Sequence, residues 1–226
     1  MPKLKSNLLV VAHPDDESIF FGGLVQRRRI LPWHLVCVTD GNADGRGAER
    51  HHDLLSAAKA LKIKRTEHWD FPDRFNARLD VDQVARRLLD LPAPKAVFTH
   101  SILGDYGHPH HQDVSLAVHR AFHGRIPVWS VAYNCYPEKT LALTPKEFKI
   151  KTHILTDVYR SETRRFIHLL PATTSEAFVQ VGLVEVEHLY RVLVHKAPLE
   201  RRKLKRYAWI ADSLGDTAYG TLERPF

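Results

Sequence analysis

The sequence predicts an α/β protein with a Rossmann-like, mainly parallel sheet flanked by helices, and with a helical or irregular C-terminal third packed on that sheet. Three observations lead to this prediction. Short apolar runs end in polar loops, as buried strands do. Segments whose apolar residues recur at helical spacing separate these runs. Because parallel pairing requires long crossover connections, this alternation indicates parallel strands.

Each expected element follows from one of two patterns. A strand is expected wherever a short apolar run is bounded by turn residues, and a helix wherever apolar residues line one face, as Leu54, Leu55, Ala58 and Leu61 do. In chain order, we expect strand 6–12, helix 24–30, strand 34–39, helix 48–61, strand 66–71, helix 81–91, strand 96–100, helix 111–122 and strand 128–133.

The C-terminal third is less regular. From Pro137 onward the pattern is mostly helical: residues 145–170 indicate one or two helices, and residues 181–194 fit either a strand or a helix. The chain has no internal repeat, low-complexity tract or clear linker. We therefore expect residues 1–226 to form a single domain.

The composition is that of a globular protein with a sizeable core, since hydrophobic residues make up 44% and charged residues 26% of the chain. No apolar run reaches the ~20 residues needed to cross a bilayer, and charge follows the N-terminus too closely for a signal peptide. We expect a cytoplasmic protein without a transmembrane segment. Cys37 and Cys135 do not form a Cys-x-x-Cys pair, so any metal must use nitrogen and oxygen ligands.

The formal charge of +7 suits a phosphorylated or nucleotide-linked substrate, an acidic surface, or solubility alone. The densest basic run, residues 201–206, has Tyr207 and Trp209 beside it and must be weighed as a nucleic-acid patch. A solvated helix face explains the run with fewer assumptions, so no nucleic-acid partner is expected.

A first polar cluster follows the first strand, where residues 12–17 read AHPDDE. Adjacent carboxylates repel one another, and a nearby cation is the simplest way to keep them ionised. An Asp-rich loop between a strand and a helix can also serve only to cap the helix. This segment alone supports both interpretations equally.

A second cluster follows the fourth strand, where residues 104–113 read GDYGHPHHQD. Both clusters should project from the carboxyl edge of one parallel sheet, where α/β folds place their sites. Three histidines within four positions, facing the first cluster, favour metal binding. Two histidines and one carboxylate would leave a fourth position for water, as in catalytic zinc sites.

The chain resembles the N-acetylglucosaminyl-phosphatidylinositol de-N-acetylases, also called LmbE-like deacetylases. Three segments carry the resemblance: AHPDDE at 12–17, the Thr39-Asp40-Gly41 strand end followed by Arg50, and GDYGHPHH at 104–111. The resemblance covers roughly the first two-thirds of the chain, in order. The first and third segments in combination are specific, whereas a short motif alone would be weak.

The resemblance implies that His13, Asp16 and His111 bind one zinc ion per chain and that Asp15 is the general base. It places His108 near the reacting carbonyl, where a protonated imidazole would stabilise the oxyanion. Either Asp15 or His108 would protonate the departing amine. The family motif usually reads HPDH, and here His110 replaces its aspartate, which removes a carboxylate that could orient an imidazole.

Substrate contacts are expected from Arg50, which lies where family members carry a sugar-binding arginine, and from Asp73 and Arg74 after the third strand. Each is as readily a surface or capping residue. The substrate implied is a small N-acetylated amino sugar or sugar conjugate, such as a precursor of a glycolipid, thiol or polysaccharide. A homo-oligomer is possible.

Two other functions were weighed against the deacetylase. A nucleotide- or nucleic-acid-binding Rossmann-like module is disfavoured because the first strand ends in HPDDE, which places negative charge where a phosphate would sit. An assembly subunit that docks through a helical tail would leave both polar clusters unexplained. The enzyme is therefore the leading hypothesis.

Overall fold

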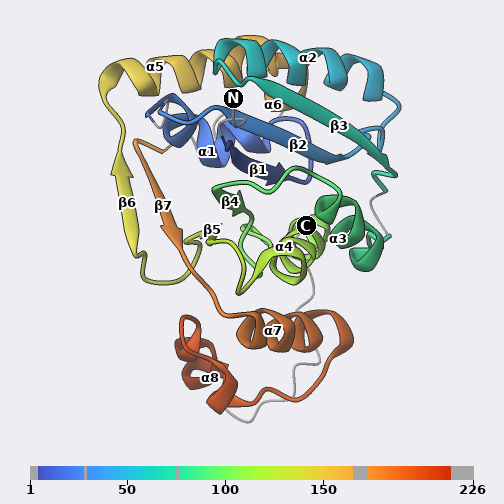
Figure 1. Cartoon of the computed structure of the whole chain (residues 1–226), viewed down its shortest axis with the longest axis vertical. Helices are drawn as coiled ribbons and strands as arrows, with labels where there is room; N and C mark the ends of the chain where they lie inside the picture. The colour runs from blue at the N-terminus through green and yellow to red at the C-terminus, as the bar shows by residue number, and fades with distance from the viewer. Residues whose placement is uncertain (1–4, 28–29, 75–76, 165–172, 215–226) are drawn as a thin grey trace.

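A seven-stranded sheet organises the chain in the computed structural model, which describes residues 5–27, 30–74, 77–164 and 173–214 (Figure 1). The strand order is β3-β2-β1-β4-β5-β7-β6. The strands are β1 (Asn7–Val11), β2 (Trp33–Thr39), β3 (Arg65–Phe71), β4 (Ala96–Thr99), β5 (Val128–Val131), β6 (Lys139–Ala142) and β7 (Ser175–Val179). β1 to β5 pair in parallel, as the alternation of strands and helices predicts.

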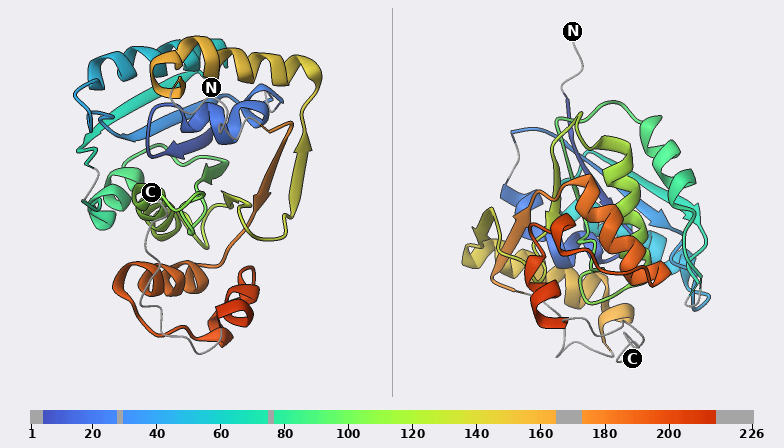
Figure 2. Two further views of the ribbon diagram at one scale, coloured as in Figure 1. Left: turned by 180° about the vertical axis from the view of Figure 1, so that it is seen from behind. Right: turned by 90° about the horizontal axis from the view of Figure 1, so that it is seen from below.

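Helices cover both faces of the sheet. α1, α2, α5 and α6 lie on one side and α3 and α4 on the other, with α7 beside α4 and α8 beyond α7 (Figures 1 and 2). The helices are α1 (Asp16–Arg27), α2 (Gly47–Ala60), α3 (Val81–Leu89), α4 (Pro109–Phe122), α5 (Pro145–His153), α6 (Arg160–Thr163), α7 (Leu183–His195) and α8 (Ala208–Leu214). A π-helical turn (Ile154–Val158) joins α5 to α6, and a 3₁₀ turn (Arg201–Lys203) precedes α8. The Rossmann-like prediction is confirmed.

The last third of the chain departs from the expectation of a mostly helical segment. β6 and β7 extend the sheet in antiparallel fashion, with β7 pairing with β5. Both strands escaped prediction because β6 is largely exposed and β7 carries the buried Glu176 in place of an apolar residue. The ambiguous segment 181–194 is helix α7. The helical prediction for 145–170 agrees up to Thr163, and its residues 165–170 lie outside the described part.

Two helices begin earlier than predicted. α1 begins at Asp16 instead of residue 24, so the second aspartate and the glutamate of HPDDE lie in the first helical turn, where the helix dipole favours carboxylates. α4 begins at Pro109 instead of residue 111. His108 is its N-cap and Pro109 occupies the first helical turn, a position that proline tolerates well.

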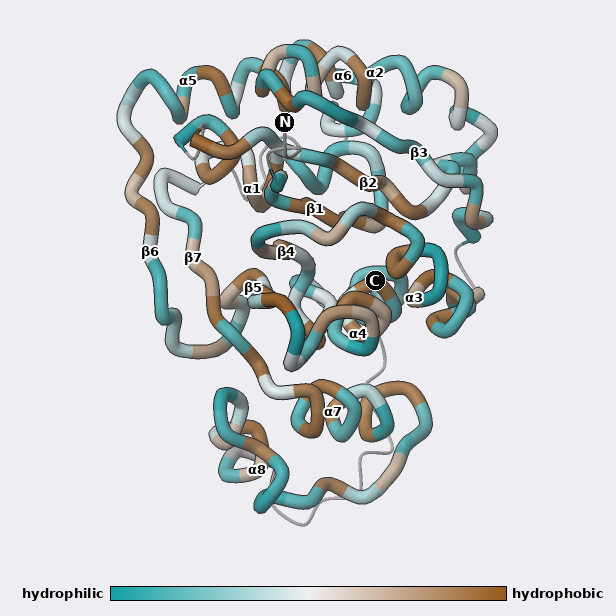
Figure 3. The backbone as a smooth tube through the Cα atoms, in the orientation of Figure 1, coloured by the Kyte–Doolittle hydropathy of each residue, from teal (hydrophilic) through white to brown (hydrophobic). Residues whose placement is uncertain are grey.

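The core lies on both faces of the sheet because successive strand residues point in opposite directions. On β1, Leu9 and Val11 pack in the cluster beneath α1 and α2, whereas Leu8 and Val10 pack in the cluster beneath α3 and α4. The central strand β1 is accordingly apolar after Asn7, whereas the outer helices carry many polar residues (Figure 3). A third apolar cluster joins α7 and α8 to Leu116 of α4.

The strand order places the site. β1 pairs with β2 on one side and with β4 on the other, so the chain leaves β1 and β4 toward opposite faces of the sheet. In α/β folds, a crevice forms outside the carboxyl ends of strands at such a switch point. One polar cluster follows each of these two strands.

None of the helices in the described ranges combines the length and apolarity needed to span a bilayer.

Candidate active site

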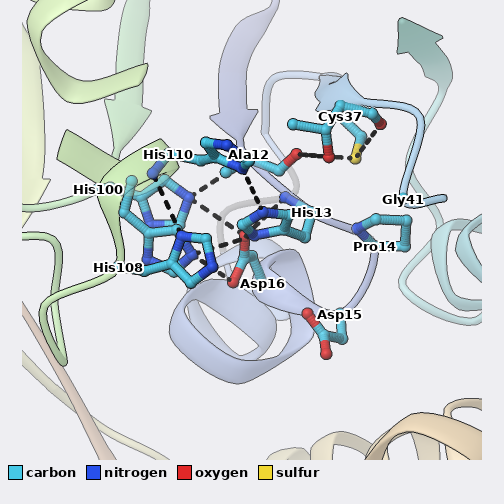
Figure 4. Close-up of polar contacts among 12 residues, drawn as sticks. Ala12, His13, Pro14, Asp15, Asp16, Cys37, Gly41, His100, His108 and His110 are labelled. Carbon is cyan, nitrogen blue, oxygen red and sulfur yellow. Dashed lines mark hydrogen bonds and ion pairs between the residues drawn. The ribbon is translucent and has the colours of Figure 1, made fainter. Parts of the chain in front are cut away.

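Three potential metal ligands from the two clusters converge at the switch point (Figure 4). His13 Nδ1 lies 3.3 Å from His111 Nε2 and 3.4 Å from Asp16 Oδ2, and His111 Nε2 lies 3.3 Å from Asp16 Oδ1. All three residues are buried. His13 lies in the loop after β1, Asp16 in the first turn of α1, and His111 in the first turn of α4.

The spacing of these atoms suits zinc. Zinc–nitrogen bonds of about 2.0–2.1 Å in a tetrahedron place neighbouring ligand atoms ~3.3–3.4 Å apart, because the tetrahedral edge is about 1.63 times the bond length. The observed separations of 3.3 and 3.4 Å are close to that edge, with Asp16 facing His13 through Oδ2 and His111 through Oδ1. The donor set of two imidazoles and one carboxylate is also one that zinc accepts in catalytic sites. The residues therefore fit a zinc ion, which the resemblance predicts.

Asp105 orients the metal-facing imidazole of His111, a role that the sequence did not reveal. Its Oδ2 accepts hydrogen bonds from Nδ1 of His111 at 2.9 Å and from Nδ1 of His100 at 2.6 Å. With its proton on Nδ1, His111 presents the Nε2 lone pair to the site. The sequence suggested that no carboxylate was left to orient an imidazole, because His110 replaces the family's aspartate. Asp105, which belongs to the same GDYGHPHH segment, supplies that carboxylate.

His100 at the end of β4 also escaped sequence reasoning, although it directly follows a buried strand. Its Nε2 accepts the backbone N–H of Ala12 at 3.0 Å, so His100 ties the ends of β1 and β4 together. Gly104, between His100 and α4, has φ +78°, and a Cβ there would lie 2.6 Å from the backbone oxygen of His108. Glycine is therefore required for the loop to fold beneath the start of α4.

The carboxylates around His13, Asp16 and His111 favour a positive charge at this site. Burial disfavours charge on His13, but hydrogen bonds and charges from Asp16 and Asp73 outweigh it and raise the pKa of His13 to about 9. Burial likewise opposes ionisation of Asp16, yet His111 and His100 hold the pKa of Asp16 well below its usual range. Without a metal, a proton on His13 therefore supplies the charge that a bound cation would supply.

Asp15 has a strained backbone, with φ +113°, which is costly for a residue other than glycine. Its backbone N–H donates to Glu17 Oε2 at 3.1 Å, and Glu17 Oε1 accepts the Tyr159 hydroxyl at 2.9 Å, which holds the turn. Burial and the charge of Asp16 raise the pKa of Asp15 well above its usual range. Its carboxylate stands apart from the imidazoles, with no polar contact drawn to it (Figure 4). A raised pKa suits a general base.

His108 lies beside the ligands, with its ring centroid 4.4 Å from that of His13 and 4.8 Å from that of His111. Its Nδ1 accepts the backbone N–H of His110 at 3.2 Å, so the neutral ring carries its proton on Nε2. Burial and the neighbouring imidazoles lower the pKa of His108. The structure thus favours a neutral donor over the imidazolium expected from the sequence.

The expected substrate-contact residues occupy different positions. Arg50 is buried, and its guanidinium donates to the Pro14 oxygen at 3.1 Å, so it holds the loop between His13 and Asp15. Asp73 approaches His13 Nε2 at 3.6 Å and Arg50 Nη1 at 3.6 Å, which places it within the site. Arg74 is exposed, next to Asp73 in the loop after β3. Substrate contact by these residues stays a prediction.

Together, the fold and these side chains define an α/β protein with a buried, metal-competent histidine and carboxylate site at its sheet switch point. The GlcNAc-PI de-N-acetylase (PIG-L) family matches residues 8–122, a span that includes both clusters. The chain belongs to this family, as the sequence motifs predict.

Curated relatives carry similar sequences. An N-acetylglucosaminyl-phosphatidylinositol de-N-acetylase of Bos taurus is 37% identical over 123 residues, which are 49% of this chain and 48% of that protein. A probable N-acetylglucosaminyl-phosphatidylinositol de-N-acetylase of Schizosaccharomyces pombe is 33% identical over 119 residues, 48% of each protein. The chain thus spans about half the length of the curated relatives it matches.

A solved structure with the same fold is the N,N'-diacetylchitobiose deacetylase of Pyrococcus horikoshii. It superposes with a TM-score of 0.64 at 18% identity, covering 80% of this chain and 85% of that one. At this identity, the likeness shows the fold alone.

Proposed function

We propose that this protein is a zinc-dependent N-deacetylase that hydrolyses the amide of an N-acetylated amino sugar or sugar conjugate. The group of His13, Asp16 and His111 carries the proposal, because its imidazole nitrogens lie 3.3 Å apart and each lies 3.3–3.4 Å from one oxygen of Asp16, a spacing that suits a zinc ion. Family membership and the names of the curated relatives support the amide and the amino sugar. A cytoplasmic location and a homo-oligomer stay predictions.

Asp15 and His108 have separate roles in the proposed hydrolysis. Bound zinc would supply Lewis acidity, which polarises an amide carbonyl and makes water nucleophilic near neutral pH. The Asp15 carboxylate, with its raised pKa, accepts the proton of the attacking water. His108 donates its Nε2–H to the oxyanion that develops from the carbonyl oxygen. Asp15, which then holds the proton from the water, passes it to the departing amine, because a neutral His108 has no acidic proton to give.

The alternative of a nucleic-acid-binding module loses its main support. Within the basic run 201–206, Arg202 and Lys203 pair with Glu200, Arg201 pairs with Asp212, and Arg206 pairs with Glu138. Acidic partners neutralise most of the positive charge that a phosphate backbone would need.

The described strands form one sheet, which supports our proposal of a single domain.

Metal analysis of purified protein together with activity tests the proposal. The wild type should hold about one zinc ion per chain, and His13→Ala, Asp16→Ala and His111→Ala should each lose it while keeping their circular dichroism spectra. Zinc retention in two of these variants would contradict the ligand assignment.

Asp15→Asn separates chemistry from metal binding. The amide has nearly the size of the carboxylate but cannot accept the proton, so the variant should keep zinc and lose most turnover. Turnover is measured as acetate release from N-acetylglucosamine derivatives. Near-wild-type turnover would remove Asp15 from the role of base.

A further inference from the structure

The side chain of His110 makes polar contacts that the proposed mechanism does not use. It stands where the family motif has an aspartate, and its side chain is buried in the first turn of α4. Its Nε2 lies 3.0 Å from the backbone oxygen of Ala77, and its Nδ1 lies 3.1 Å from Nε2 of His13. His110 therefore contacts the side of the His13 ring that faces away from Asp16 and His111.

The partners of His110 fix the positions of the protons. A carbonyl oxygen only accepts, so the oxygen of Ala77 requires a proton on Nε2 of His110. A neutral His110 then has a lone pair on Nδ1, which accepts the Nε2–H of His13. With its proton held on Nε2, His13 has Nδ1 free as a metal-binding lone pair. That atom is the one 3.3 Å from His111 Nε2.

Asp73 is the other candidate partner of His13, and its geometry is poorer. Its Oδ1 lies 3.6 Å from His13 Nε2 and 3.4 Å from His110 Nδ1, compared with 3.1 Å between the two imidazole nitrogens. Asp73 also faces Arg50 at 3.6 Å, which draws on the same carboxylate. The negative charge of Asp73 favours a proton on Nε2 of His13. The acceptor within hydrogen-bonding distance of that proton is Nδ1 of His110.

We propose that His110 is a positioning residue that fixes the tautomer and ring orientation of the metal ligand His13. The hydrogen-bonded chain runs from the Ala77 carbonyl through His110 to His13, and it performs for His13 what Asp105 performs for His111. An imidazole thus takes over an orienting function usually given to a carboxylate or carbonyl. This inference rests on the proposed function, because zinc is the ion that His13 would hold.

Zinc affinity of two variants tests the proposal, measured by competition with a chromophoric chelator. His110→Leu fills the site but cannot accept a hydrogen bond, so its zinc Kd should rise about 10–100-fold, as is usual when an orienting partner is lost. His110→Asn places an amide oxygen near the position of Nδ1. Its Kd should therefore return to within about threefold of the wild-type value, a margin well below that 10–100-fold loss.

A matched control and a spectrum separate positioning from packing. His119→Asn replaces another buried histidine of α4, whose ring contacts the Ser115 oxygen of its own helix and no other hydrogen-bond partner among the described residues, and it should keep the wild-type zinc Kd. In cobalt-substituted protein, the visible d–d absorption should shift in His110→Leu and match the wild type in His110→Asn, since it reports ligand geometry.

Three results would overturn the inference. Wild-type affinity in His110→Leu would show that His13 needs no such partner, and equal losses in the Leu and Asn variants would show that the ring serves packing. A wild type with two zinc ions and a His110→Asn variant with one would make His110 a ligand of a second ion. These outcomes all require zinc in the wild type, whereas a wild type that binds no zinc refutes the proposed function itself.

Discussion

Replacing Asp105 by asparagine is the sharpest test of how this site holds its metal. The carboxylate accepts from His100 Nδ1 at 2.6 Å and His111 Nδ1 at 2.9 Å through Oδ2, and from the Ser101 backbone N–H at 3.0 Å through Oδ1. Asparagine has a single side-chain oxygen, which can accept either from the two imidazoles or from the Ser101 backbone N–H, but not from both. If it keeps the Ser101 contact, its NH₂ group faces two ring N–H groups, and donors then oppose donors.

The magnitude follows from the bonds lost. Two hydrogen bonds to a charged group, at about 1.5–3 kcal/mol each, set a loss of unfolding free energy of about 3 kcal/mol or more. His111 can relieve the conflict by moving its proton to Nε2, but that tautomer turns a hydrogen toward Asp16 and the metal position. Zinc affinity should therefore fall about 10–100-fold, which is about 1.4–2.7 kcal/mol.

Chelator competition gives the zinc Kd, and urea unfolding of metal-free protein gives the stability. Glu185→Gln is the control, because Glu185 is also buried and accepts two backbone N–H groups, of Lys205 at 2.7 Å and Tyr207 at 3.0 Å, in the α7 region. It should lose stability and keep zinc affinity. If both variants lost stability alike and neither lost zinc affinity, the orienting role of Asp105 would be refuted.

Three further predictions concern single side chains. His108→Ala should keep zinc and lower kcat by about 10²–10³, the usual loss for one oxyanion donor, and an unchanged kcat would contradict its role. Burial lowers the pKa of His119 to about 4, so the unfolded chain binds the proton first as pH falls from ~6.5. The wild type should lose about 3 kcal/mol of stability over that window, and urea unfolding of His119→Leu should show a flatter pH dependence. Lys151→Met breaks the buried 2.9 Å ion pair with Glu176 and should cost about 3–5 kcal/mol in the same assay, part of which the added Glu176→Gln substitution should restore.

Local patterns were sufficient to predict the parallel half of the fold. β1 and β2 are buried on both faces and therefore read as nearly continuous apolar runs. The same reasoning failed for β6 and β7. β6 is mostly exposed, and β7 carries Glu176, which is buried because Lys151 and the backbone N–H groups of α1 solvate its carboxylate. Partners so distant in sequence leave no periodic signal.

The sequence by itself determined the class of site, because HPDDE and HPHH follow buried strands whose carboxyl ends must meet at one edge of a parallel sheet. It could not assign protons within that site. Only the tertiary structure decided that Asp105 orients His111, that His110 contacts His13 and that His108 is a neutral donor. The reason is physical: motif spacing fixes which side chains approach one another, whereas a histidine tautomer depends on the partner of each ring nitrogen, and Ala77 lies 33 residues from His110 in sequence.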